Sequence, residues 1–203
     1  MPWLALYHGV TSKSYSESEF KMEKFTAKDK QIFADMKQCI TDFGLNILNE
    51  SELETTICGF STFKHPDPRW YMAILFTFQP SQKLIGLSIR YPDVQKEKMP
   101  ALYVLFNHIN INMRLSHFCI DPNIWIDPDL RMMLLNTGLY VTGYFLNKDE
   151  FRTLLNKLFE TSHTFYPLIE NVLTTDQTPQ AIMDVFYETH GQIHPGFHKE
   201  EIL

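Results

Sequence analysis

A helix-like pattern of apolar positions runs through the centre of the chain, from Ala101 to Met113. Its opposite face is also apolar, because Tyr103, Val104 and Ile111 lie there. A helix that is apolar on two sides is either covered within its own fold or buried against a partner. These three residues are therefore candidate interface residues. The first stripe repeats at spacings of three and four and comprises Leu102, Leu105, Phe106, Ile109 and Met113.

Three more segments show helical periodicity. The first is predicted to begin at the N-cap Thr26, with Asp29 completing a capping box, and to end at Gly44. The second should begin at Asn147 and keep one apolar stripe to Val172. Pro167 lies on the opposite face of this second helix and should bend it without ending it. A last short helix is expected from Thr178–Pro179 to about Gly191.

Segments rich in β-branched and aromatic residues fall between these helices. Three strands are expected near 54–63, 69–79 and 83–91, followed by two near 116–126 and 130–142. The strand at 69–79 is apolar on both faces, which predicts a central strand covered on both sides. Short turns favour antiparallel pairing. The predicted class is α+β, an antiparallel sheet with helices packed on it, in the order α-β-β-β-α-β-β-α plus a C-terminal helix.

The expected domain organisation has three parts. Residues 1–25 should form a flexible arm, residues 26–176 an α+β domain, and residues 177–203 a C-terminal helix and tail. A chain of 203 residues can bury a core without a disulfide or metal staple.

Composition and charge argue against several classes of function. The net charge is −6 and there is no Lys/Arg cluster, which argues against nucleic-acid binding. No segment approaches ~20 consecutive apolar residues and no signal peptide is recognised, so we expect a cytoplasmic protein that does not span a membrane. The cysteines Cys39, Cys58 and Cys119 lack CxxC spacing and are interpreted as reduced, buried thiols.

Two groups of side chains could suggest metal binding. His190, His194 and His198 recur every four residues, but Gly191, Pro195 and Gly196 would interrupt a helix there, which favours a solvated tail. The segment 121–129 carries three aspartates and Asn123 without the order of a calcium loop, so Asx-Pro turns explain it better. We predict no catalytic residue, cofactor or metal.

The central segment also carries a resemblance to a known family. Leu105–Asn112 resembles the L-x-N-x-x-N helix of the YbjN family, with Asn107 and Asn110 as its two asparagines. The following Ser116–Asp121, and later Gly138–Glu150 and Phe165–Leu168, are similar to further segments of that family. The resemblance spans 25–172 and implies a fold like that of class I type III secretion chaperones. By their chemistry, the two asparagines are expected to bond backbone groups where helix meets strand.

Two hypotheses follow. The resemblance implies a bacterial, non-enzymatic protein with chaperone-like or regulatory binding. It would hold a partner polypeptide, or itself in a homodimer, through an apolar helix face or a sheet edge. The alternative is a small-molecule or metal-binding domain, enzymatic or not, that uses an aromatic pocket and the tail containing His190, His194 and His198.

Overall fold

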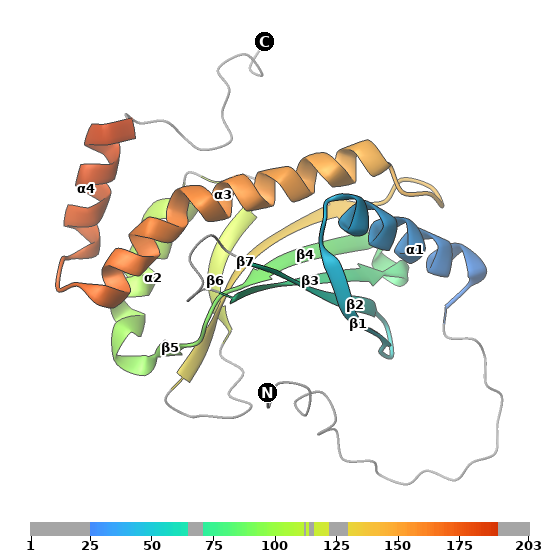
Figure 1. The fold of residues 1–203 in the computed structure, drawn as a ribbon, viewed down its shortest axis with the longest axis horizontal. Helices are drawn as coiled ribbons and strands as arrows, with labels where there is room; N and C mark the ends of the chain where they lie inside the picture. The colour runs from blue at the N-terminus through green and yellow to red at the C-terminus, as the bar shows by residue number, and fades with distance from the viewer. Residues whose placement is uncertain (1–24, 65–70, 112, 114–115, 122–129, 191–203) are drawn as a thin grey trace, which may run out of the picture.

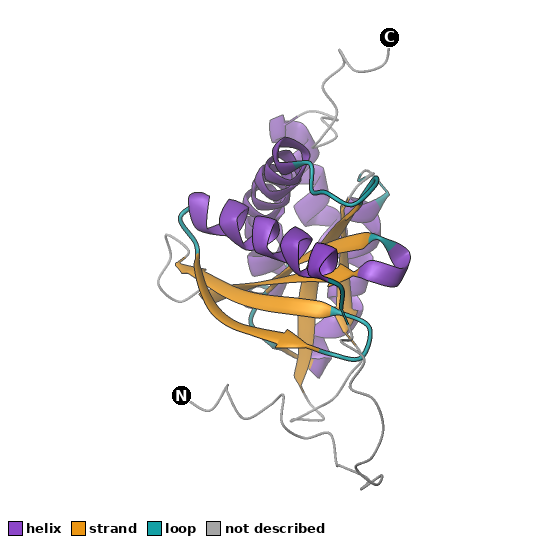
Figure 2. Ribbon diagram, turned by 90° about the vertical axis from the view of Figure 1, so that its right-hand side faces the viewer, coloured by secondary structure: helices purple, strands orange, loops and turns teal. Residues whose placement is uncertain are grey.

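The computed structural model describes residues 25–64, 71–111, 113, 116–121 and 130–190. Within these ranges one antiparallel sheet carries the helices on one of its faces (Figures 1 and 2). The expected arm before Phe25, the calcium-loop candidates Asn123, Asp127 and Asp129, and the histidines His194 and His198 lie outside the described residues.

The helices begin and end where local signals place them. In α1 (Ala27–Asp42), Thr26 and Asp29 form the predicted capping box. Gly44 has a φ of +86°, the left-handed conformation that favours glycine after a helix. The Asn147 side chain caps α3 (Lys148–Thr174), which continues through Pro167. The remaining helices are α2 (Met99–Asn110) and α4 (Pro179–His190).

Every strand pairing in the sheet is antiparallel, which confirms the predicted α+β class. The spatial order is β1-β2-β3-β4-β7, with β6 on the far side of β7 and the short β5 paired with the start of β7. The strands are β1 (Asn46–Glu52), β2 (Ile57–Lys64), β3 (Tyr71–Gln79), β4 (Leu84–Arg90), β5 (Val94–Gln95), β6 (Ser116–Asp121) and β7 (Leu130–Tyr140).

The strand β1 is absent from the predicted order. Its sequence Asn-Ile-Leu-Asn-Glu-Ser-Glu is mostly polar and exposed, so it shows no strand-like alternation of apolar residues. Pairing with β2 and two ion pairs to α1 hold it in place. Lys37 Nζ lies 2.7 Å from Glu50 Oε2, and Lys30 Nζ lies 3.8 Å from Glu52 Oε1. Contacts with β2 and α1, and not its own apolar pattern, therefore determine that this segment forms a strand.

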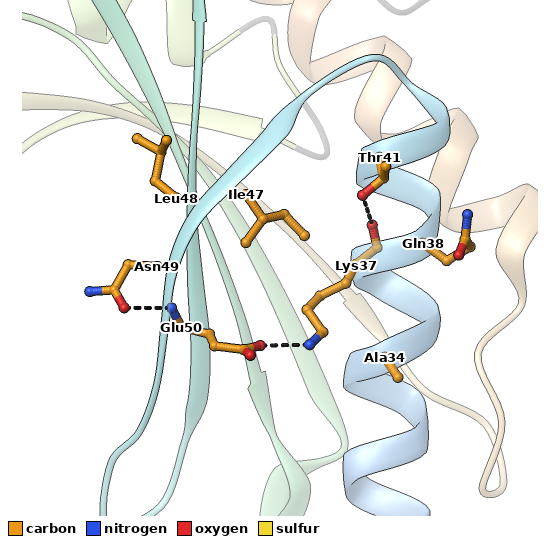
Figure 3. A pocket seen from close by; sticks show the side chains of 8 residues that line it. All are labelled: Ala34, Lys37, Gln38, Thr41, Ile47, Leu48, Asn49 and Glu50. Atoms are coloured by element: carbon orange, nitrogen blue, oxygen red, sulfur yellow. Dashed lines mark hydrogen bonds and ion pairs between the residues drawn. The ribbon is translucent and has the colours of Figure 1, made fainter.

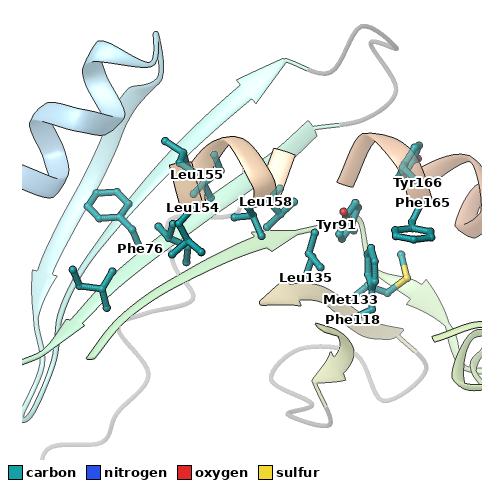
Figure 4. Packing of buried hydrophobic residues seen from close by; sticks show 14 of the residues in the cluster. Phe76, Tyr91, Phe118, Met133, Leu135, Leu154, Leu155, Leu158, Phe165 and Tyr166 are labelled. Atoms are coloured by element: carbon teal, nitrogen blue, oxygen red, sulfur yellow. The ribbon is translucent and has the colours of Figure 1, made fainter. Parts of the chain in front are cut away.

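The core lies between the helices and the inner face of the sheet (Figure 4). Phe33 of α1 stacks on Phe76 of β3, with ring centroids 5.4 Å apart. Gly59 on β2 provides room for Phe76, because a Cβ there would lie 2.1 Å from the ring. Leu155 and Leu158 of α3 are fully buried over the same face. Each such side chain contributes about 1.5–3 kcal/mol by leaving water.

The sequence predicted that β3 is covered on both faces, and this prediction is wrong for its outer face. β3 is central in the sheet, and Ile74, Phe76 and Phe78 are buried on its inner face. Ala73, Leu75 and Thr77 on its outer face are only half-buried. The helices that contact the sheet do so through the inner face (Figure 2). An antiparallel strand satisfies its backbone by pairing and can therefore leave one face without a helix.

Candidate functional site

The two faces of α2 have different surroundings. All five inward residues are buried (Met99, Leu102, Leu105, Phe106 and Ile109). The predicted interface residues point outward, and Tyr103 is 50% exposed, Val104 46% and Ile111 83%. Elements of the same chain contact α2 elsewhere, because β6, α3 and α4 all pack against it. Among the described residues, no element of the chain covers this second stripe.

The outward stripe follows helical spacing. Val104, Asn107 and Ile111 are separated by three and four residues, so they lie along one line of the helix. Asn107 is exposed on this line, and its carbonyl accepts the backbone N–H of Ile111 at 3.2 Å. Tyr103 lies beside it. The result is an apolar strip with one amide in its middle.

Asn110 points the other way and joins α2 to β6. Its Nδ2 donates to the carbonyl of Phe118, and its Oδ1 accepts from the backbone N–H of Phe118, both at 2.8 Å. This is the kind of local backbone bond expected of the motif asparagines. Asn107, by contrast, faces outward.

β6 and β1 form the two edges of the described sheet. On β1, as on β6, a side chain bonds a backbone group of the edge strand. At β1, Oδ1 of Asn49 accepts the backbone N–H of Glu50 at 2.8 Å. The pairing register shifts between Ile47 and Asn49, and Leu48 at this bulge is 61% exposed. Bulges and charged side chains are common devices that protect an edge strand from pairing with another chain.

An open groove of about 520 Å³ lies between α1 and β1 (Figure 3). The ion pair of Lys37 and Glu50 crosses it, and the Thr41 hydroxyl donates to the Lys37 carbonyl. Its charged groups therefore already have partners within the chain. An exposed ion pair of this kind contributes only about 0–1 kcal/mol, and the groove shows no converging set of groups that would select a ligand.

A second groove, of about 420 Å³, separates the end of α3 from α4. His190 lies in its wall, where the imidazole stacks on Phe186 at a centroid distance of 4.5 Å. Its Nδ1 is 3.1 Å from the Phe186 carbonyl. In the described part of the chain, no three His, Cys, Asp or Glu side chains come together as a metal site would require.

Sequence reasoning missed a group of exposed aromatic residues where β7 leads into α3. Tyr140, Tyr144 and Phe145 are 71%, 64% and 68% exposed. Two lysines from other elements approach one of the rings, with Lys28 Nζ 4.5 Å and Lys83 Nζ 5.3 Å from the Tyr144 centroid. Such cation–π contacts are favourable. The only sequence signal was the Gly143-Tyr-Phe run.

The cysteines, and the histidines near the motif asparagines, lie in buried or peripheral positions. Burial raises the pKa of the Cys39 and Cys58 thiols, so the nucleophilic thiolate is disfavoured at both. The sulfur of Cys119 accepts an N–H from Asn136 at 3.0 Å. His108 is half-buried on α2, and His117 is exposed on β6.

Comparison with solved structures gives a likeness of fold. No family model matches the chain, and no curated protein matches it by sequence. The fold is similar to that of YbjN from E. coli, described as a candidate transcription regulator, with a TM-score of 0.41 and 11% identity over 78% of this chain and 92% of that chain. This is a likeness of fold alone.

Helix length and polarity bear on membrane insertion. None of the helices in the described ranges is both long and apolar enough to cross a membrane.

Proposed function

We propose that this protein is a non-enzymatic, cytoplasmic binding module of the YbjN-like type, chaperone-like or regulatory in role. It holds a polypeptide against the outward face of α2, either a partner segment or the same face of a second copy. The observation that carries the proposal is the exposure of Tyr103, Val104 and Ile111 on a helix whose other face is in the core.

An exposed Ile or Val alone is ordinary on a protein surface, but a helical line of such residues is a common docking surface. Burying the two aliphatic side chains against a partner contributes ~1.5–3 kcal/mol each. Asn107, between them, offers an amide that could fix the register of the partner. An amphipathic helix or a short apolar segment fits this surface.

The helix face is favoured over a sheet edge because both described edges carry an intramolecular bond. Asn110 occupies the backbone groups of Phe118 on β6, and Asn49 occupies the N–H of Glu50 on β1. A partner strand would have to displace these side chains, whereas Tyr103, Val104 and Ile111 on α2 are already exposed.

The test is the double variant V104E/I111E, with L48E as the control. All three positions are exposed and aliphatic, but Leu48 lies on β1. Size exclusion with light scattering and capture of partners from lysate should show that V104E/I111E weakens association at least about tenfold, or ~1.4 kcal/mol. L48E should behave as wild type.

Thermal unfolding separates binding from folding. Substitutions at exposed positions usually change stability by no more than about 0.5 kcal/mol. A stable V104E/I111E protein that keeps the partners and the oligomeric state of wild type would refute the proposal.

A further inference from the structure

The two edges of the sheet are protected in different ways. β1 carries Glu50 and Glu52, and its pairing has a bulge near Leu48. β6 (Ser116–Asp121) has a carboxylate only at its last residue, Asp121, and the stretch from Ser116 to Ile120 contains no Asp, Glu, Lys, Arg or Pro. A stretch of edge strand without such residues is a template for pairing with another chain. A different device must therefore protect this stretch.

The geometry at Phe118 shows which backbone groups of β6 face away from β7. In an antiparallel pair, residues alternate between those that bond their partner strand and those whose N–H and C=O point outward. Both backbone groups of Phe118 bond to Asn110 at 2.8 Å. The backbone N–H and C=O of Phe118, which pairs with Leu135, therefore point away from β7. Phe118 lies at the centre of the edge that β6 forms in the described sheet.

The Asn110 carboxamide presents one N–H and one C=O to Phe118, as a residue of a neighbouring antiparallel strand would. We propose that Asn110 protects the edge strand β6. Its side chain takes the place of a neighbouring strand and so keeps β6 from pairing with β6 of a second copy. The partner excluded by this contact is the same chain.

A second copy fits this edge because the edge is complementary to itself. With Phe118 opposite its own equivalent, each supplies the N–H and the C=O that the other needs. In that register His117 lies opposite Cys119 and Ser116 opposite Ile120, so no like charges meet. Two copies would then share one continuous sheet.

β6 should keep its position when the Asn110 carboxamide is removed. The Phe118 side chain is 2% exposed and belongs to the core. Its ring stacks on Phe106 at 5.2 Å and meets Phe165 edge-on at 6.2 Å. These contacts hold β6 against the inner helices independently of Asn110. Loss of the carboxamide therefore exposes the backbone groups of a strand that is still formed.

The experiment compares N110A with N156A, which removes an identical side chain from an exposed position on α3. Sedimentation velocity over a range of concentrations should show dimerisation of N110A at least about tenfold stronger than that of N156A. Hydrogen exchange at the Phe118 amide should slow as the N110A protein concentration rises, because a second copy then supplies the missing acceptor. No such change is expected for N156A.

Additional variants test the register and separate this surface from that of α2. Adding H117K/C119K to N110A places lysines opposite each other and should remove the added self-association. Adding V104E/I111E should leave the N110A dimer intact, because that face is not used. If N110A does not fold, N110D takes its place, since aspartate keeps the acceptor for the Phe118 N–H and loses the donor.

Three results would overturn the inference. One is a folded N110A, or N110D in its place, that self-associates no more than N156A. The others are a dimer that persists with H117K/C119K and Phe118 exchange that is independent of concentration.

Discussion

The Tyr91 hydroxyl donates a hydrogen bond of 2.7 Å to Oγ of Ser162, and so joins the segment after β4 to the middle of α3. Both side chains are buried, and the Tyr91 ring stacks on Tyr166 at 5.8 Å. Burial raises the pKa of the Tyr91 hydroxyl, which remains a neutral donor over the ordinary pH range. This bond therefore satisfies both hydroxyl groups within the apolar layer between α3 and the sheet.

The first prediction concerns this bond. Tyr91→Phe removes one donor and keeps the ring, so the free energy of unfolding should fall by about 1 kcal/mol. A double-mutant cycle with Ser162→Ala, followed by denaturant unfolding, should give a coupling energy of similar size. Additive effects of the two substitutions would show that the bond contributes no net stability.

A second prediction concerns the contact between Gly59 and Phe76. A methyl group at position 59 would overlap the Phe76 ring, which is fully buried. Gly59→Ala should therefore lower the free energy of unfolding by about 1–3 kcal/mol. Combining it with Phe76→Leu should cost less than the sum of the two single changes, because leucine leaves room for the methyl group. Purely additive losses would rule out the steric explanation.

A third prediction concerns pH. The Gln38 amide at 2.7 Å, and then the Arg152 guanidinium at 2.9 Å, hold the pKa of Asp42 below its usual range. The folded state therefore binds this proton less readily than the unfolded chain. The stabilisation is complete above the unfolded-state pKa of Asp42 and is lost as pH falls through the folded-state pKa.

Asp42→Asn should therefore make the loss of stability at acid pH shallower, as measured by thermal unfolding from neutral to acid pH. Arg152→Met should remove part of the same dependence and keep the part due to Gln38. Because Asp42 is exposed, added salt should weaken the effect. An unchanged pH profile for Asp42→Asn would contradict the assignment.

The fourth prediction concerns thiol reactivity. Cys39 is 0% exposed on α1, and burial raises its pKa more than the nearby Arg152 and Lys148 lower it. Alkylation of Cys39 by iodoacetamide should therefore be slow in the native protein and accelerate with denaturant. Cys119 is half-buried and serves as the comparison within the same sample. Equal native labelling rates, measured by mass spectrometry, would disagree with this environment.

Helix boundaries were predictable because their signals are local. Thr26 and Asp29 are three residues apart and cap α1, Gly44 ends it, and Asn147 begins α3. The apolar stripe through Leu105 also identified the inward face of α2 correctly. In each case residues within one or two helical turns set the backbone conformation.

The candidate surface was predictable only in part. Periodicity identified Val104 and Ile111 as a second apolar line, but only the packing of α2 against the rest of the chain shows that this line is exposed. The aromatic group around Tyr144 was not predicted, because Lys28 and Lys83 reach it from distant parts of the sequence. Its exposure depends on how three separate elements meet.

The sequence by itself determined the helices, most strands, and the inward side of α2, because these follow from spacing along a few residues. Only the tertiary structure decided that polar β1 joins the sheet, that β7 lies between β4 and β6, and that Asn110 reaches Phe118. Strand order and edge contacts depend on backbone groups that every residue carries, so side-chain pattern alone does not specify them.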